Sequence, residues 1–195
     1  MIAMARKYEF KPDKPQNGFF SKLFLTQKQR RSVLKWALYS LVLLVLSVLQ
    51  DVLLCRFRLF GATTELVICG IFLICVMEGM EKGSVFCLCA GCVYLFSGTA
   101  AGYYSIVLIP ALGVAVTWFR QSFLRKGFSA AMLCTAVATT VYEILVFAIG
   151  LFLGMTIAGH IGTFALTAAM TLLAAPVLYP IVKSIGTIGG EAWKE

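Results

Sequence analysis

The sequence predicts an all-α integral membrane protein, with about six transmembrane helices in one bundle. Apolar residues make up 60% of the 195 residues and charged residues only 13%, whereas soluble domains are about 45–50% apolar. A soluble chain of this length has too much surface for its volume to bury so many apolar side chains. In hydrocarbon an unpaired peptide group is costly, so a spanning segment must be a helix or part of a closed barrel. No stretch alternates apolar and polar residues over the length of a barrel strand, and helices are therefore expected.

The basic residues predict contact with a membrane surface. The formal net charge is +8, which in a soluble protein would suggest a nucleic-acid partner. Here Lys and Arg stand at the ends of apolar runs, where they meet anionic headgroups and orient the spans. Membrane lipids are the expected partner, and nucleic acid is not. The seven cysteines lie almost all inside apolar runs, where Cys behaves as a small apolar residue, so disulfides are not expected.

The chain divides into three parts. Residues 1–32 are a basic cytoplasmic segment, residues 33–184 form the transmembrane bundle, and residues 185–195 are a short cytoplasmic tail. Between Phe19 and Phe24, apolar residues recur at helical spacing beside lysines and arginines. This pattern is typical of an amphipathic helix lying on the cytoplasmic leaflet, and a basic tail without structure fits it equally well.

Six apolar runs are candidate spans. The third covers only about 21 Å as a helix, against about 30 Å of hydrocarbon. It must extend past its apparent ends, thin the bilayer locally or enter as a re-entrant segment. Pro110 predicts a kink in the fourth run. The runs are Val33–Leu54, Thr63–Met77, Ser84–Ser97, Tyr103–Phe119, Ser129–Gly154 and Thr163–Val182.

The distribution of Lys and Arg favours six complete spans. With six spans and a cytoplasmic N-terminus, 15 of the 17 lie at the cytoplasmic side, Lys35 included, and only Arg56 and Arg58 lie outside. A re-entrant third run would change this split to ten against seven. The positive-inside rule therefore predicts six spans in the inner membrane with both termini in the cytoplasm.

Glu143 is the strongest candidate for a functional side chain. It lies near the middle of the fifth run, where a carboxylate is costly, so it should face the bundle interior or a partner. Thr139 and Thr140, one turn earlier, could share its hydrogen bonds. The other spans offer almost no ionisable groups, and a proton or ion relay needs several. A structural or partner-facing carboxylate is therefore favoured over transport chemistry.

The remaining motifs predict packing rather than chemistry. Gly150 and Gly154 form a GxxxG, which lets two helices approach closely, and Ala111–Ala115 is a looser relative. The three cysteines of Cys87–Cys92 point in different directions on a helix and do not converge on a metal ion. No catalytic, cofactor-binding or metal-ligating set is recognisable, so the sequence predicts a protein that is not an enzyme and has no cofactor.

From about residue 34 to residue 184 the chain resembles MreD, the small membrane protein of the bacterial rod-shape (elongation) machinery. The family typically has Pro-Asp where this chain has Thr64 and Glu65, and often an acidic residue where it has Tyr94. The matching segments are Val48–Gln50, Gly61–Leu66, Ala90–Gly98 with Gly102, and Thr140–Glu143. With the motifs above, the candidate packing or partner residues are Glu143, Gln50, Glu65, Gly91, Gly98, Gly102, Gly150 and Gly154.

The resemblance implies a function that composition does not. MreD-like proteins resemble, in fold, the substrate-binding S components of energy-coupling-factor vitamin transporters. They act as non-enzymatic scaffolds of the cytoplasmic membrane that bind MreC and, through it, RodA and a class B penicillin-binding protein in peptidoglycan synthesis. The alternative is an S component itself. S components usually carry an Ala-x-x-x-Ala stripe on the first helix, where this chain has a lone Ala37, so the scaffold is favoured.

Overall fold

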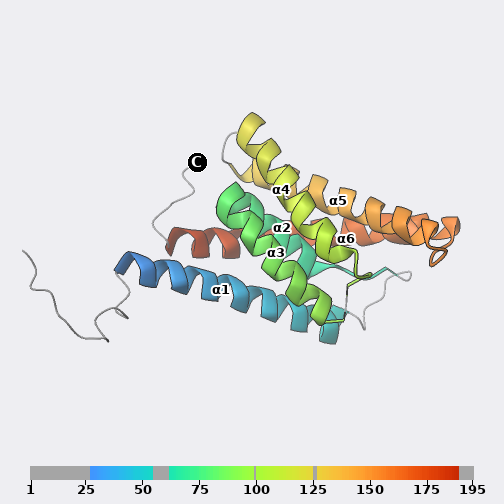
Figure 1. The fold of residues 1–195 in the computed structure, drawn as a ribbon, viewed down its shortest axis with the longest axis horizontal. Coiled ribbons are helices and arrows are strands. Elements are labelled where there is room, and N and C mark those ends of the chain that lie inside the picture. Colours follow the sequence, from blue (N-terminus) through green and yellow to red (C-terminus); the bar gives the residue numbers. More distant parts are fainter. Residues whose placement is uncertain (1–26, 55–61, 99, 125–126, 189–195) are drawn as a thin grey trace, which may run out of the picture.

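The computed structural model describes residues 27–54, 62–98, 100–124 and 127–188, and Figure 1 shows them as an elongated bundle of helices. A single π-helical turn, η2 (Gln50–Leu54), continues the first helix, and a 3-10 turn, η3 (Ala158–His160), precedes the last. The six α-helices of the described residues are α1 (Gln27–Leu49), α2 (Leu66–Glu78), α3 (Met80–Phe96), α4 (Ser105–Phe123), α5 (Phe128–Phe152) and α6 (Ile161–Ile188).

Four helical segments are long and apolar enough to cross a membrane, so the chain is a multi-pass helical membrane protein. They are Gln29–Val52, Ser105–Phe123, Phe128–Phe152 and Ala158–Ile188. The other two helices are shorter: α2 has 13 residues and α3 has 17, which correspond to about 20 and 26 Å. The predicted all-helical fold is thus confirmed, whereas the predicted count of six spans is not.

The helix boundaries follow the apolar runs, but several helices extend past them; α1 already begins at Gln27, and α4 ends at Phe123. Of the three alternatives for the third run, the structure shows an extension, at its start only: α3 begins at Met80 and ends at Phe96. The last helix continues beyond the sixth run to Ile188. Pro110 lies inside α4. The predicted amphipathic helix around Phe19–Phe24 lies outside the described residues.

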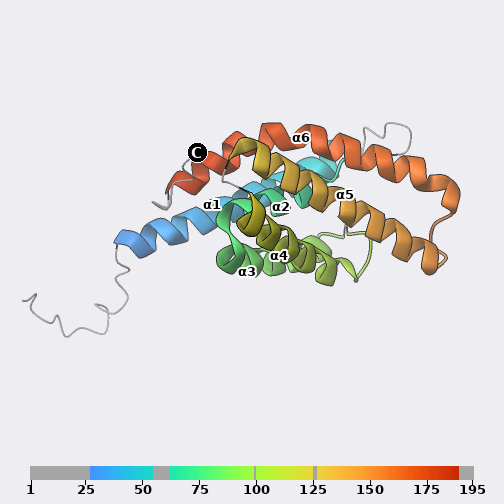
Figure 2. The same cartoon turned by 90° about the horizontal axis from the view of Figure 1, so that it is seen from above.

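The shortest α-helix, α2, occupies the centre of the bundle (Figures 1 and 2). Every residue from Leu66 to Val76 is buried, and α2 packs against α1, α3, α4, α5 and α6. A helix that is apolar on all sides is expected at a core, because it has no polar face to turn towards water. The second apolar run is therefore the core of the protein rather than a lipid-facing span.

Small residues bring α3 close to its two neighbours. A Cβ atom on Gly83 would lie 2.6 Å from the carbonyl oxygen of Cys75, so α3 meets the backbone of α2 with no room for a side chain. Gly91, one of the predicted packing residues, lies in ordinary contact with Ile109 of α4. In the Ala111–Ala115 motif it is the central Gly113 that is buried against α3.

The structure differs from the GxxxG interpretation of Gly150 and Gly154. Gly154 lies beyond the end of α5 with φ +69°, and a Cβ there would meet nothing within 4 Å. Gly150 is covered by Thr156 of the following turn, and its carbonyl accepts hydrogen bonds from the backbone N–H groups of Met155 and Thr156. Both glycines therefore belong to the C-terminus of α5 and the turn towards α6. Gly98 similarly follows the end of α3 without a neighbour within 4 Å.

Candidate functional site

Side chains from other helices satisfy the free backbone groups at the start of α2. The Oε1 atom of Gln50 accepts a hydrogen bond from the backbone N–H of Val67 at 3.1 Å. The backbone N–H of Glu65 donates to Oγ1 of Thr171, on α6, at 3.0 Å. The first turn of a helix leaves such N–H groups without intrahelical partners. Gln50, predicted as a packing or partner residue, therefore ties the end of α1 to α2 within this chain.

A cavity of about 390 Å³ lies at this end of the bundle, next to the start of α2. It contains two carboxylates, Glu65 before α2 and Glu143 on α5, and we call it the carboxylate cavity. Its other polar side chains come from the segments before α2 and α4, the α5–α6 turn and α6. They are Thr63, Tyr104, Thr156, Thr163 and Thr167.

Glu143 lines this cavity as a buried side chain without a partner. It is only 6% exposed, and within the described part of the chain its carboxylate has no hydrogen bond or ion pair. The expectation that Thr139 shares its hydrogen bonds is wrong, because the Thr139 hydroxyl donates to the Thr135 carbonyl at 2.9 Å. Glu143 thus faces the interior as predicted, but into a cavity rather than against hydroxyl groups.

Glu65 brings a second carboxylate to the same place. Its Oε2 atom is buried and has no hydrogen-bond partner in the described residues. The charges of Glu65 and Glu143 interact, and they repel each other when both side chains are ionised. Glu65, inside the second predicted run, is therefore an ionisable group close to Glu143, where almost none was expected. The sequence could not show the pairing, because the two residues are far apart along the chain.

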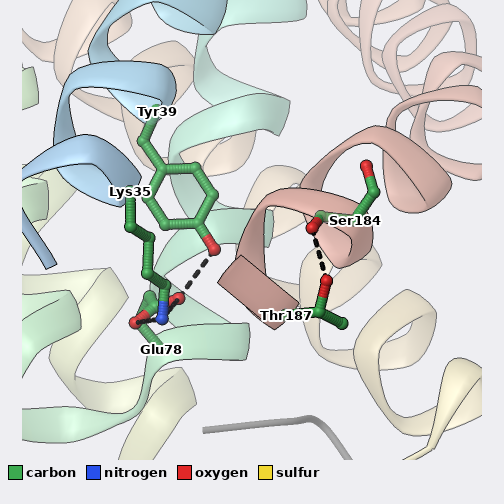
Figure 3. A network of polar contacts seen from close by, with 5 residues as sticks. All are labelled: Lys35, Tyr39, Glu78, Ser184 and Thr187. Atoms are coloured by element: carbon green, nitrogen blue, oxygen red, sulfur yellow. Dashed lines mark hydrogen bonds and ion pairs between the residues drawn. The ribbon is translucent and has the colours of Figure 1, made fainter. Parts of the chain in front are cut away.

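The opposite end of the bundle holds a buried ion pair, shown in Figure 3. The Nζ atom of Lys35, on α1, lies 2.7 Å from the carboxylate of Glu78 at the end of α2, and the two side chains are 7% and 4% exposed. The hydroxyl of Tyr39 donates to Oε1 of the same carboxylate at 2.6 Å. We call Lys35, Tyr39 and Glu78 the ionic cluster. The cluster was not predicted from the sequence, because Lys35 was expected to meet lipid headgroups at the end of the first run.

Arg120 adds a second buried cation at that end. It is 4% exposed, and its guanidinium donates to the backbone carbonyl of Val76 in the last turn of α2. The last carbonyls of a helix lack intrahelical donors and carry partial negative charge, so a cation stabilises this end. From the sequence, Arg120 was expected only as one of the 15 basic residues of the cytoplasmic side.

Of the remaining sequence candidates, Gly102 and Gly150 lie at the carboxylate cavity, whereas the cysteines of the third run join neither site. Cys87 is buried whereas Cys89 is exposed, so these cysteines do not face one centre. Within the described residues, no group of three or more His, Cys, Asp or Glu side chains could hold a metal ion. Gly102 packs against the ring of Tyr104 beside the cavity, and Gly150 is part of its lining.

Fold and site together define a multi-pass helical membrane protein with a buried two-carboxylate cavity at one end. No protein-family model, curated protein or solved structure matches the chain.

Proposed function

We propose that the chain is a non-enzymatic membrane scaffold of the bacterial cell-shape (elongation) machinery. In this role it binds an MreC-like membrane protein and, through it, RodA and a class B penicillin-binding protein, and so supports peptidoglycan synthesis. The proposal starts from the MreD-like segments of the sequence, among them Val48–Gln50 and Thr140–Glu143. It includes six spans in the cytoplasmic membrane with both termini in the cytoplasm, in line with the 15 to 2 distribution of Lys and Arg.

The position of α2 supports a span despite its length. A helix in contact with lipid must match about 30 Å of hydrocarbon or deform the bilayer. The 13 residues of α2 are enclosed by five other helices, so protein rather than lipid meets both of its ends. The short helix therefore does not argue against a six-span topology.

The observation that supports a scaffold best is a groove between α1 and α3 that none of the described segments covers. It has a volume of about 340 Å³ and is walled by Ser40, Ser47, Cys89 and Ala90 among others, with Val67 of α2 also in its lining. Small side chains let a further transmembrane helix approach closely, where van der Waals packing drives association in lipid. We infer that side chains of one transmembrane helix of the partner enter this α1–α3 groove.

Co-purification with the MreC-like protein tests the proposal. The ring introduced by Ser47→Phe or Cys89→Phe would fill the groove, and we expect partner recovery to fall at least about tenfold, corresponding to about 1.4 kcal/mol. Ala169→Phe is the matched control, because Ala169 is exposed on α6, away from the groove. Recovery that is equal for groove and control variants would assign the partner contact elsewhere, and the absence of any MreC-like partner would contradict the scaffold.

The carboxylate cavity supports a second candidate, a substrate-binding S component of a vitamin transporter. A cavity of about 390 Å³ lies in the size range of small-molecule sites. The two candidates differ in what they bind in the membrane: an S component would co-purify with the membrane subunit of an energy-coupling transporter and not with an MreC-like protein.

A further inference from the structure

We infer that the carboxylate cavity binds a small organic cation that carries a protonated amine. The inference goes beyond the scaffold, because it concerns a ligand site at the Glu65 end of α2 rather than the α1–α3 groove. It rests on the geometry of two acidic side chains, on the character of the rest of the lining, and on the size of the space between them.

The carboxylates of Glu65 and Glu143 lack hydrogen-bond partners among the described residues. Glu143 is 6% exposed and has no hydrogen bond within the described residues, although it lines a cavity. The Oε2 atom of Glu65, in the same lining, is also buried without a partner. Buried charges in proteins are paired, because removing an ion from water without compensation costs several kcal/mol. Two such groups in one cavity provide a place for a positive charge.

The rest of the described lining also suits a cationic ligand. Among the described lining residues there is no Lys, Arg or His, so none of them supplies a counter-charge. The threonine hydroxyls of Thr63, Thr156 and Thr167 can accept hydrogen bonds from an ammonium group, which has three donors and no acceptor. Tyr104 adds an aromatic ring, a surface that attracts cations. Every polar group in this lining can therefore serve a cationic ligand.

The volume of the cavity and its access from the surface also suit an organic ligand. Small-molecule sites run from about 300 to 1,000 Å³, and this cavity measures about 390 Å³. Calcium takes six to eight oxygen ligands at about 2.4 Å, a tighter and more acidic arrangement than two carboxylates around a space of this size. Met155 of the lining is 72% exposed, so a ligand can enter at this end of the bundle. An organic cation fits better than a bare metal ion.

Putrescine, a four-carbon diamine, is the probe we choose, and 1,4-butanediol is its neutral counterpart of the same length. Binding to the full-length chain in lipid nanodiscs is measured by isothermal titration calorimetry. We expect saturable binding of putrescine and none of butanediol. Glu143→Gln and Glu65→Gln preserve the shape of the side chain and remove its charge, so each should weaken binding at least about tenfold. Glu81→Gln removes an exposed glutamate at the other end and should change nothing.

Several results would overturn the inference. Absence of putrescine binding to the wild type is one, and equal affinity in wild type and both Gln variants is another. Tighter binding of Mg²⁺ or Ca²⁺ than of putrescine would assign the site to a metal ion. Binding that appears only after Arg56→Gln and Arg58→Gln would assign the carboxylates to the chain's own arginines. The melting temperature of each variant is measured to verify that it is folded. Co-purification of the MreC-like protein, measured separately, tests the scaffold independently of this site.

Discussion

The two ends of α2 carry buried charge in opposite ways. At the Glu78 end, the buried side chains of Lys35 and Glu78 neutralise each other at 2.7 Å. Arg120 donates a hydrogen bond to a carbonyl in the last turn of the same helix. At the Glu65 end, two carboxylates share a cavity and the described lining offers no cation. A paired cluster is complete within the chain and holds the helices together. An unpaired cluster is complete only when something from outside the described residues supplies the missing charge.

Breaking the ionic cluster should have the largest effect on stability. Lys35→Met removes the cation and leaves the Glu78 carboxylate buried with the Tyr39 hydroxyl as its one remaining partner among the described residues. Removing one partner of a buried pair typically costs about 3–5 kcal/mol, so we expect a clearly lower melting temperature in detergent. Arg31→Met, at an exposed cation of α1, is the control.

A second substitution sharpens this prediction. In Lys35→Met/Glu78→Leu both charges are absent, and stability should largely recover, because no buried charge remains uncompensated. If the double variant is as unstable as the single one, the loss comes from packing of the lysine stem and not from charge.

Arg120→Met should have the next largest effect. It leaves the carbonyl of Val76 without its donor, and loss of a hydrogen bond to a charged group costs about 1.5–3 kcal/mol. Urea unfolding in mixed micelles should show a loss in this range. Gln121→Met, at the exposed neighbouring position, should remain close to wild type, and equal losses in the two variants would show that Arg120 does not stabilise the end of α2.

Substitutions at Glu143 should affect stability least. Interhelical hydrogen bonds in membranes contribute about 0.6 kcal/mol on average and about 1.7 at most, and Glu143 makes none with the described residues. We expect melting temperatures of Glu143→Gln and Glu143→Leu within a few degrees of wild type. A strong destabilisation by both variants would show that Glu143 stabilises the helix packing, as the ionic cluster does.

Cysteine labelling from the two sides of the membrane assigns each end to a compartment without altering stability. We expect His160→Cys, near the carboxylate cavity, to react with an impermeant reagent from outside, and Ser122→Cys, at the Arg120 end, to be protected. Both positions are exposed. The reverse pattern would contradict the N-in, C-in topology.

The helices could be predicted from the sequence because the length of an apolar run indicates the length of the helix. The same run does not distinguish lipid from protein as the surroundings of that helix. That ambiguity is also why the central position of α2 was missed: Leu66–Val76 is uniformly apolar, and such a run looks the same against lipid and against five helices. The position of Glu143 was predictable from the cost of its charge. Its companion Glu65 and the Lys35–Glu78 pair were not, since both pairs join residues distant in sequence and depend on how the helices pack.

The enclosed position of α2 has a consequence for the order of biosynthesis. Chains are inserted from the N-terminus as they are made, so α2 leaves the ribosome before α4, α5 and α6 exist to cover it. During that interval its neighbours are acyl chains, which its apolar surface tolerates on every side. Its later enclosure exchanges lipid contacts for protein contacts, and the gain comes from close packing such as that of Gly83 on Cys75. A polar substitution in α2 should therefore reduce the yield of inserted protein before it affects the finished fold.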